Sequence, residues 1–270
     1  GVKAKTLFHL QMDWPKVNAA PASVRIRKLG RRFWLSFSYQ RNDEKNILAP
    51  ETLLEGFGQL SREELEDCVV GLDRGVNKVI ATSRDDFLHT PEDEAHRVAK
   101  KERRKKRWQR IVSRRNKGSA NRAKARSKLA KQYAKLRNVR FNRAHHISKE
   151  LVEDKRNEVL VFEDLKTKNM TRSAKGTTEQ PGRNVKAKSG LNRSILGSMW
   201  GQVKTFTTYK AAERNKLAVS VSPVNSSREC PKCGHTHKNN RKGERFHCRK
   251  CGHEADADSN AGVNLRGRAI

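Results

Sequence analysis

Two cysteine pairs near the carboxyl end constrain the fold of this chain more than any other feature. Fourteen residues separate the pairs, which are Cys230-Pro-Lys-Cys233 and Cys248-Arg-Lys-Cys251. Thiolates at this spacing are typical of a tetrahedral structural zinc site in a zinc ribbon. Gly234 and Gly252 follow the pairs, where a tight knuckle turn often needs positive φ. Two disulfides are the alternative, but other bulk properties look intracellular and Cys68 stands alone in an apolar run, so we predict one structural Zn²⁺.

The charge of the chain indicates a polyanionic partner. The 270 residues include 60 Lys and Arg against 29 Asp and Glu, a formal net charge of +31. Each Lys or Arg beside a phosphate releases a condensed counterion, which favours nucleic-acid binding. An anionic membrane is the alternative, but no apolar run approaches the roughly 18 residues of a membrane span, and we see no lipidation signal or signal peptide. We expect a cytoplasmic protein with no membrane partner.

The first part of the chain predicts short strands. Residues 22–40 alternate in hydrophobicity around Gly30, which predicts a β-hairpin. A polar segment from Pro50 to Glu66 follows. The apolar runs at 68–73, 79–82 and 87–90 predict a three-stranded meander.

A strongly basic stretch follows the meander. Residues 97–143 contain 21 Lys or Arg and one acid, Glu102. Gly118-Ser119 predicts a break between two helices. The second helix is expected to bury an apolar stripe made of Leu129, Tyr133, Leu136, Ala144, Ile147 and Leu151. The excess of basic residues predicts a helical hairpin that contacts nucleic acid. A solvated helix or a disordered tail is the alternative. The candidate contacts are Arg103, Arg104, Lys105, Arg107, Trp108, Arg114 and Arg115.

The second half predicts a mixed α/β plan. Residues 158–163 and 217–222 read as strands, and 166–189 as a mobile loop. One amphipathic helix is expected to bury the apolar residues of the next segment, which are Ile195, Leu196, Met199, Trp200, Val203 and Phe206. The order of strands and helices favours an α/β fold.

Three acids stand at the ends or starts of predicted elements. Asp73 and Glu163 end apolar strands, and Asp258 opens the last segment. Polar groups at strand ends meet at one rim of a sheet, where three carboxylates suit two Mg²⁺ or Mn²⁺ ions. Each acid alone could equally be a turn former or a helix cap. The combination in so basic a chain predicts metal-dependent phosphodiester hydrolysis.

These motifs resemble a known family. The segments Gly71-Leu-Asp73-Arg-Gly75-Val, Val161-Phe-Glu163-Asp-Leu165 and Ala257-Asp258-Ser-Asn260-Ala resemble the three split RuvC motifs. Their order, with the cysteine pairs between the second and third, resembles TnpB, the OrfB protein of bacterial insertion sequences. Miniature type V CRISPR nucleases and Fanzor proteins share this design.

The resemblance implies an RNase H-like (RuvC) nuclease that cuts DNA under RNA guidance, with an omega-type guide RNA and target DNA as partners. It places Asp73, Glu163 and Asp258 on the catalytic positions. Asp258 is chosen over Asp256 because the family's acid stands two residues before the asparagine, here Asn260. It also implies a bacterial or archaeal protein associated with the nucleoid.

The resemblance implies a domain plan as well. Residues 1–66 would be part of a β-rich wedge domain, and 67–222 the nuclease domain with a basic helical insertion at 93–155. Residues 223–253 would form the ribbon and 254–270 the final nuclease segment. Most of the family's N-terminal recognition region is expected to be missing. The alternatives are a related protein that binds RNA or DNA without cutting, and a strand-joining transposase.

Overall fold

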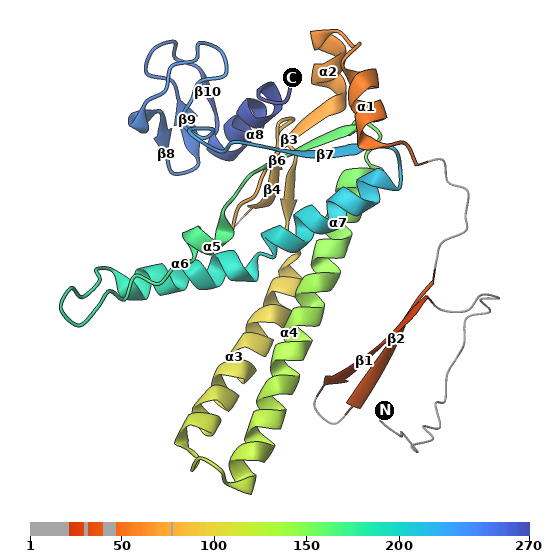
Figure 1. Ribbon diagram of the computed structural model, residues 1–270. Helices are drawn as coiled ribbons and strands as arrows, with labels where there is room; N and C mark the ends of the chain where they lie inside the picture. Colours follow the sequence, from red (N-terminus) through yellow and green to blue (C-terminus); the bar gives the residue numbers. More distant parts are fainter. Residues whose placement is uncertain (1–21, 30–31, 40–46, 77) are drawn as a thin grey trace. The chain divides into compact units, whose positions relative to one another are not determined.

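The computed structural model describes residues 22–29, 32–39, 47–76 and 78–270 (Figure 1). The chain divides into two compact units, residues 1–44 and 45–270. The assignment of residues 1–66 to a wedge domain stays a prediction.

The first unit contains a β-hairpin. Strand β1 (Ser23–Leu29) pairs with β2 (Arg32–Ser38) in antiparallel register, from Ser23 opposite Ser38 to Leu29 opposite Arg32. The alternating pattern of residues 22–40 predicted this hairpin, which is confirmed. The turn at Gly30 lies outside the described residues.

A five-stranded mixed sheet forms the centre of the second unit. Its order is β5-β4-β3-β6-β7. The strands are β3 (Val69–Asp73), β4 (Lys78–Thr82), β5 (Phe87–His89), β6 (Val159–Glu163) and β7 (Leu217–Val221). Strands β3, β4 and β5 are antiparallel, whereas β6 is parallel to both β3 and β7. The predicted meander and the mixed α/β plan are both confirmed.

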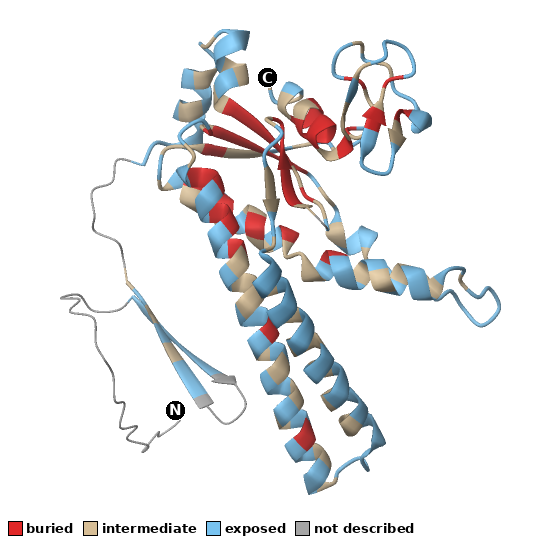
Figure 2. Cartoon of the chain, turned by 180° about the vertical axis from the view of Figure 1, so that it is seen from behind, coloured by how far each residue is buried: buried red, intermediate tan, exposed pale blue. Residues whose placement is uncertain are grey.

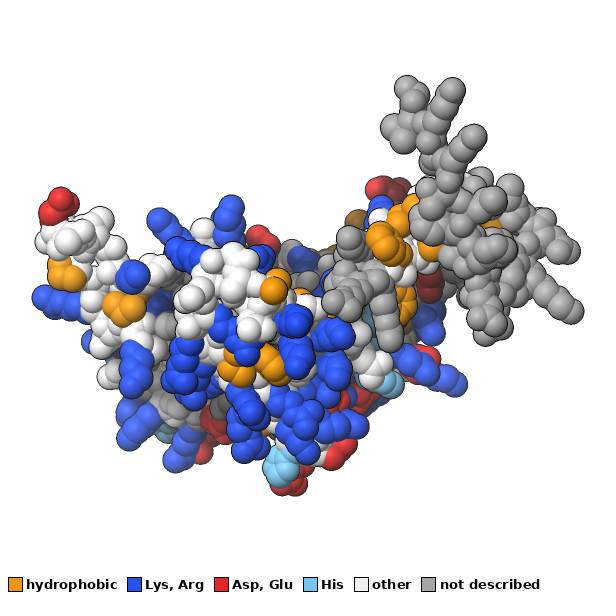
Figure 3. Space-filling view, turned by 90° about the horizontal axis from the view of Figure 1, so that it is seen from below, with side chains coloured by type: hydrophobic (Ala, Val, Ile, Leu, Met, Phe, Trp, Pro, Cys, Tyr) orange, Lys and Arg blue, Asp and Glu red, His pale blue; other side chains and the backbone are white. Residues whose placement is uncertain are grey.

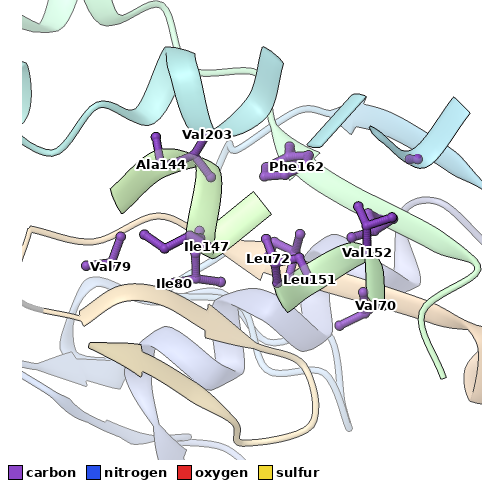
Figure 4. Close-up of a cluster of buried hydrophobic side chains, with 12 residues drawn as sticks. Val70, Leu72, Val79, Ile80, Ala144, Ile147, Leu151, Val152, Phe162 and Val203 are labelled. Atoms are coloured by element: carbon purple, nitrogen blue, oxygen red, sulfur yellow. The ribbon is translucent and has the colours of Figure 1, made fainter. Parts of the chain in front are cut away.

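Helices cover both faces of this sheet. Helices α4 (Ala120–Glu153) and α7 (Trp200–Ala212) pack on one face, in a core that includes Leu72 and Phe162 (Figures 2 and 4). Helix α8 (Ala257–Gly267) packs on the other face, and side chains of α1 (Pro50–Phe57) and α2 (Arg62–Cys68) join that core. Helix α2 begins with a capping box between Ser61 and Glu64. The polar segment at 50–66 therefore contributes two helices that its composition did not predict.

Helix α8 approaches the central strand unusually closely because both partners are glycines at the contact. A Cβ on Gly71 of β3 would lie 1.9 Å from the carbonyl oxygen of Gly262 of α8, far inside van der Waals contact. Any side chain at Gly71 would therefore push the helix away from the sheet. This contact sets how near α8, and the acid in its first turn, lies to β3.

The basic stretch forms a long helical hairpin. Helix α3 (Glu92–Arg114) and α4 are separated as predicted, and the Ser119 hydroxyl caps α4 by accepting from Arg122 N. The expected stripe is buried at Leu136, Ala144, Ile147 and Leu151. Leu129 is only half-buried, and Tyr133 is exposed over 48% of its surface. Its ring lies on the hairpin far from the sheet, where its hydroxyl is hydrogen-bonded to Gln109 of α3.

Of two predictions for residues 166–206, the single helix is wrong, and the loop holds only for residues 171–184, which contain neither helix nor strand. The expected loop contains α5 (Thr167–Met170) and the first turn of α6 (Val185–Gly197). The single expected helix is two helices, because Met199 adopts a left-handed conformation with φ of 61° between α6 and α7. This break leaves Leu196 61% exposed, while Ile195, Trp200 and Val203 are buried as expected.

The ribbon adds a small sheet of order β10-β9-β8. Its strands are β8 (Arg241–Lys242), β9 (Arg245–His247) and β10 (Glu254–Asp256), after a 3-10 turn at Lys238–Asn240. Strand β10 leads directly into α8. None of the helices in the described part of the chain combines the length and apolar character that a membrane span requires.

Candidate active site and metal centre

The four ribbon cysteines converge on one point. Their sulfur atoms all lie within 4.8 Å of one another, and the pairs Cys230–Cys251 and Cys233–Cys248 are each 3.6 Å apart. A disulfide needs about 2.05 Å, so the cysteines are free thiols. Zn–S bonds of about 2.3 Å in a tetrahedron place sulfurs roughly 3.8 Å apart. The residues therefore fit the predicted Zn²⁺, and disulfides are excluded.

Each cysteine pair lies in the same kind of turn. Gly234 N donates to Cys230 O at 2.9 Å, and Gly252 N donates to Cys248 O at 3.0 Å. Both glycines have positive φ, 69° and 73°. Side chains disfavour this conformation, so the glycines let both knuckles close around the same point.

The ribbon is coupled to the start of α8. Ala257 packs in the same small core as Cys230, Cys248 and Phe246. Asp256, the last residue of β10, caps α8 by accepting from Asp258 N at 3.0 Å and Ser259 N at 3.2 Å. The position of Asp258 therefore depends on the fold of the ribbon.

Two asparagines tie α8 to the segment that enters the ribbon. The amides of Asn260 and Asn264 each donate to the carbonyl oxygens of Ser226 and Glu229. Both asparagines are buried. Helix α8 is thus held at its side by these hydrogen bonds and at its start by the ribbon core.

The strand pleat directs Asp73 and Glu163 to the face that α8 covers. Alternate residues of a strand point to opposite faces. On β6, Val159 and Val161 pack in the α8 core, and Glu163 continues that series. On β3, Val69 belongs to the same core. Asp73, four residues later, points to the same face of the sheet as Val69. The two strands are parallel neighbours, so both acids lie at the same end of the sheet.

The three predicted acids line one pocket of about 440 Å³. The carboxyl groups of Asp73 and Glu163 share a hydrogen bond. Asp258 reaches the pocket from the first turn of α8. Among the residues that the structure describes, only the cysteines form a metal-ligand group with all ligand atoms within 4.8 Å. The acids are gathered around one cavity without that degree of convergence.

The shared pocket changes the acidity of two carboxyl groups. Burial, with the nearby charges of Glu163 and Asp258, raises the pKa of Asp73 to about 8. Burial also raises the pKa of Glu163, and the charge of Asp258 acts in the same direction. Like charges held close in a dry site resist ionisation. A bound divalent cation would offset this repulsion, so the carboxylate oxygens fit Mg²⁺ or Mn²⁺.

Three cations that sequence reasoning missed flank the acids. The Arg241 guanidinium lies 2.9 Å from Asp258, and Lys78 Nζ lies 3.8 Å from Asp258 and 2.5 Å from Asp256. Arg74 is buried and donates to the main-chain oxygens of Glu163 and Trp200. Arg74 directly follows Asp73 in the chain, which could have singled it out. No sequence motif near Lys78 or Arg241 marks either residue as part of a site, because each is brought to the acids by its own strand, β4 or β8.

We expect Asp73→Asn to stabilise the protein at pH 8 when no Mg²⁺ or Mn²⁺ is bound. The pKa of Asp73 is about 8 in the folded chain against an ordinary 3.8. The folded chain therefore keeps a proton that the unfolded chain releases, and the parent loses stability as the pH rises from about 4 to about 8. Asparagine does not titrate, so the variant's Tm should exceed the parent's by a few degrees at pH 8 and match it near pH 4.

Thermal unfolding of the zinc-loaded protein across this pH range, in buffer without Mg²⁺ or Mn²⁺, measures the difference. Asp164→Asn, at the exposed neighbour of Glu163, is the control and should show no such trend. A Tm difference that does not change with pH would contradict the raised pKa of Asp73.

The predicted nucleic-acid contacts all lie on α3 or at its end. Most of them are exposed arginines, namely Arg103, Arg104, Arg107, Arg114 and Arg115. Lys105 instead pairs with Glu102 at 2.5 Å. Trp108 is half-buried under Lys128, whose ammonium lies 5.0 Å from the ring centre. Arg115 donates to the main-chain oxygen of Asn121. The other four arginines present exposed side chains to a partner, whereas Lys105 and Trp108 take part in packing the hairpin.

A family model matches residues 37–174, more than half of the chain. It is OrfB_IS605, described as a probable transposase. The chain belongs to the OrfB_IS605 family. This confirms the family that the sequence motifs indicated. A second model, the Cas12f1-like TNB domain, matches residues 200–265 of this OrfB_IS605 protein, which contain all four ribbon cysteines and Asp258.

Two curated relatives of this OrfB_IS605 protein are named as RNA-guided DNA endonucleases. InsQ of Escherichia coli (strain K12) is 39% identical over 198 residues, which cover 73% of this chain and 48% of InsQ. A protein of Streptomyces pristinaespiralis is 30% identical over 200 residues, covering 73% of this chain and 44% of the relative. The chain thus spans about half the length of these relatives.

Among solved structures, a Cas12f1–sgRNA–target DNA complex aligns with a TM-score of 0.49 and 18% identity. The alignment covers 75% of this chain and 50% of that chain.

Proposed function

We propose that this chain is a TnpB-like, RNA-guided DNA endonuclease, or its catalytic part, which hydrolyses phosphodiester bonds at the acid pocket. The observation that carries the proposal is the meeting of Asp73, Glu163 and Asp258 in one pocket, although 90 and 95 residues separate them in sequence. The names of the two relatives support the substrate and the guide. An RNase H-like (RuvC) fold for residues 67–222 and 254–270, with the ribbon at 223–253 between them, is part of this proposal.

The proposal assigns two divalent cations, Mg²⁺ or Mn²⁺, to Asp73, Glu163 and Asp258. Such ions supply the activation of water and the neutralisation of charge on the leaving oxygen. The chain's own residues have separate tasks. Arg241 and Lys78 hold the Asp258 carboxylate by ion pairs, and Arg74 fixes the main chain at Glu163.

The proposed partners are a guide RNA and a target DNA. The excess of positive charge supplies the attraction to both. The α3–α4 hairpin presents exposed arginines, and Figure 3 shows Lys and Arg side chains crowding the face seen from the joined ends of these helices. A heteroduplex backbone could be held by such a surface without being read. These partners would place the protein at the nucleoid of a bacterial or archaeal cytoplasm.

The test is a cleavage assay on the full chain with the RNA that copurifies with it. That RNA is sequenced, and DNA containing the matching sequence is incubated with Mg²⁺ or with EDTA. We expect cuts only with Mg²⁺ and only in matching DNA. Single-stranded DNA is assayed for nicking in parallel.

Other outcomes would support other functions. RNA binding with no cutting of any DNA would favour the second candidate, a binding protein without guided cleavage. Joined DNA products would instead support the transposase activity that the family description names.

A further inference from the structure

A second cavity lies at the base of the α3–α4 hairpin, and we call it the root cavity. Its volume is about 610 Å³, within the range of pockets that bind small organic groups. Its walls come from α3, α4, β4 and the α6–α7 junction. Its apolar surface includes Val79, Ala95, Ala99, Ile147, Met199 and Val203.

Cations outnumber acids among the residues that line the root cavity. The lining includes Lys106, Arg140, Arg143 and Arg193, against Glu94 and Glu102. Arg140 pairs with Glu102 at 3.0 Å. Arg143 donates to His89 O, and its buried Nε has no hydrogen-bond partner in the described structure. The cavity therefore combines apolar walls with groups that attract phosphate.

The root cavity adjoins the acid pocket. Val76 lines both cavities, and its side chain is 42% exposed. At the α6–α7 break, Met199 lines the root cavity while the next residue, Trp200, lines the acid pocket. A polymer in the acid pocket can therefore continue past Val76 into the root cavity.

We propose that the root cavity is a base-binding subsite for an unpaired nucleotide of the DNA strand that enters the acid pocket. This rests on the proposed function, since it names the substrate of the same site. The apolar walls suit a nucleobase, and the cations suit the phosphates on either side. The base must be unpaired, because a base inside a duplex is covered by its stacked neighbours.

Filling the cavity tests this proposal. Ala95 and Ala99 are exposed residues on one face of α3 and both line the cavity. The double variant Ala95→Leu/Ala99→Leu narrows the cavity with residues that keep helix propensity. The matched control is Ala123→Leu/Ala130→Leu, at two exposed alanines of α4 outside the cavity.

Binding is measured on full-length, zinc-loaded chains in buffer without Mg²⁺ or Mn²⁺, so the result does not depend on cleavage. The probes are a 20-nucleotide oligothymidylate, an abasic DNA strand of equal length and charge, and the equivalent uridine RNA. We expect the parent to bind oligothymidylate about tenfold more tightly than abasic DNA, the effect of stacking one or a few bases. The cavity variant should lose most of this preference, with its affinity for abasic DNA unchanged, and the control should retain it.

Three results would overturn the proposal. Equal parental affinity for the thymidine and abasic strands would show that no base is held. An equal loss of both affinities in the cavity variant would indicate that phosphates, or another protein segment, occupy the cavity. A cavity variant that loses affinity for the uridine RNA but not for oligothymidylate would assign the cavity to RNA. Base-selective DNA binding in a chain that does not cut would leave this subsite standing while the proposed nuclease activity failed.

Discussion

Asp73→Ala is expected to abolish metal-dependent cleavage of guided DNA while RNA binding survives. Asp73 lies at the end of the central strand, shares a hydrogen bond with Glu163 and lines the acid pocket. Removing one of three carboxylates should weaken metal binding and withdraw several kcal/mol of transition-state stabilisation, a loss of about a thousandfold or more in rate. The basic surface of α3 is unchanged, so RNA should still bind.

The cleavage rate and the affinity for copurifying RNA are measured side by side. Asp164→Ala is the matched control, because this acid is exposed and adjacent to Glu163 but does not line the pocket. It should cut like the parent. If Asp73→Ala also cuts like the parent, the active site has been assigned to the wrong residues.

Cys233→Ser or Cys248→Ser is expected to release zinc and to lower nuclease activity. Structural zinc supplies about 10 kcal/mol or more of folding free energy in small zinc modules, and loss of one thiolate removes much of it. The ribbon core contains Ala257, and Asp256 caps α8 through Asp258 N. Unfolding of the ribbon should therefore misplace Asp258 and reduce cleavage.

Zinc content by elemental analysis, proteolysis within residues 223–256 and cleavage rate are the measurements. Cys68→Ser makes the same chemical change in α2, outside the ribbon, and should keep both zinc and activity. Full nuclease activity in a zinc-free variant would argue against the coupling between the ribbon and Asp258.

Much of the secondary structure was predictable because its signals are local. The alternation in residues 22–40 predicted β1 and β2, and the apolar run before Glu163 predicted β6. Gly118-Ser119 marked the break between α3 and α4, since the serine hydroxyl caps the second helix. These features depend on neighbours within a few residues of each other.

The errors arose where tertiary contacts override composition. Residues 185–189 look like a loop but begin α6. The apolar spacing through Ile195 and Phe206 predicts one helix, yet the chain turns at Met199, and Trp200 then donates from its indole to Gly75 O at 3.0 Å. A partner 125 residues away leaves no trace in the local pattern.

The sequence by itself determined the chemistry available to this protein. The cysteine spacing specified four thiolates for one metal, and the motifs singled out Asp73, Glu163 and Asp258 and indicated the family. Only the tertiary structure decided how those acids meet. The Gly71–Gly262 contact brings α8 onto β3, and β4 and β8 bring Lys78 and Arg241 to Asp258. The raised pKa of Asp73 depends on burial and on distances between charges, which exist only once these remote segments have packed together.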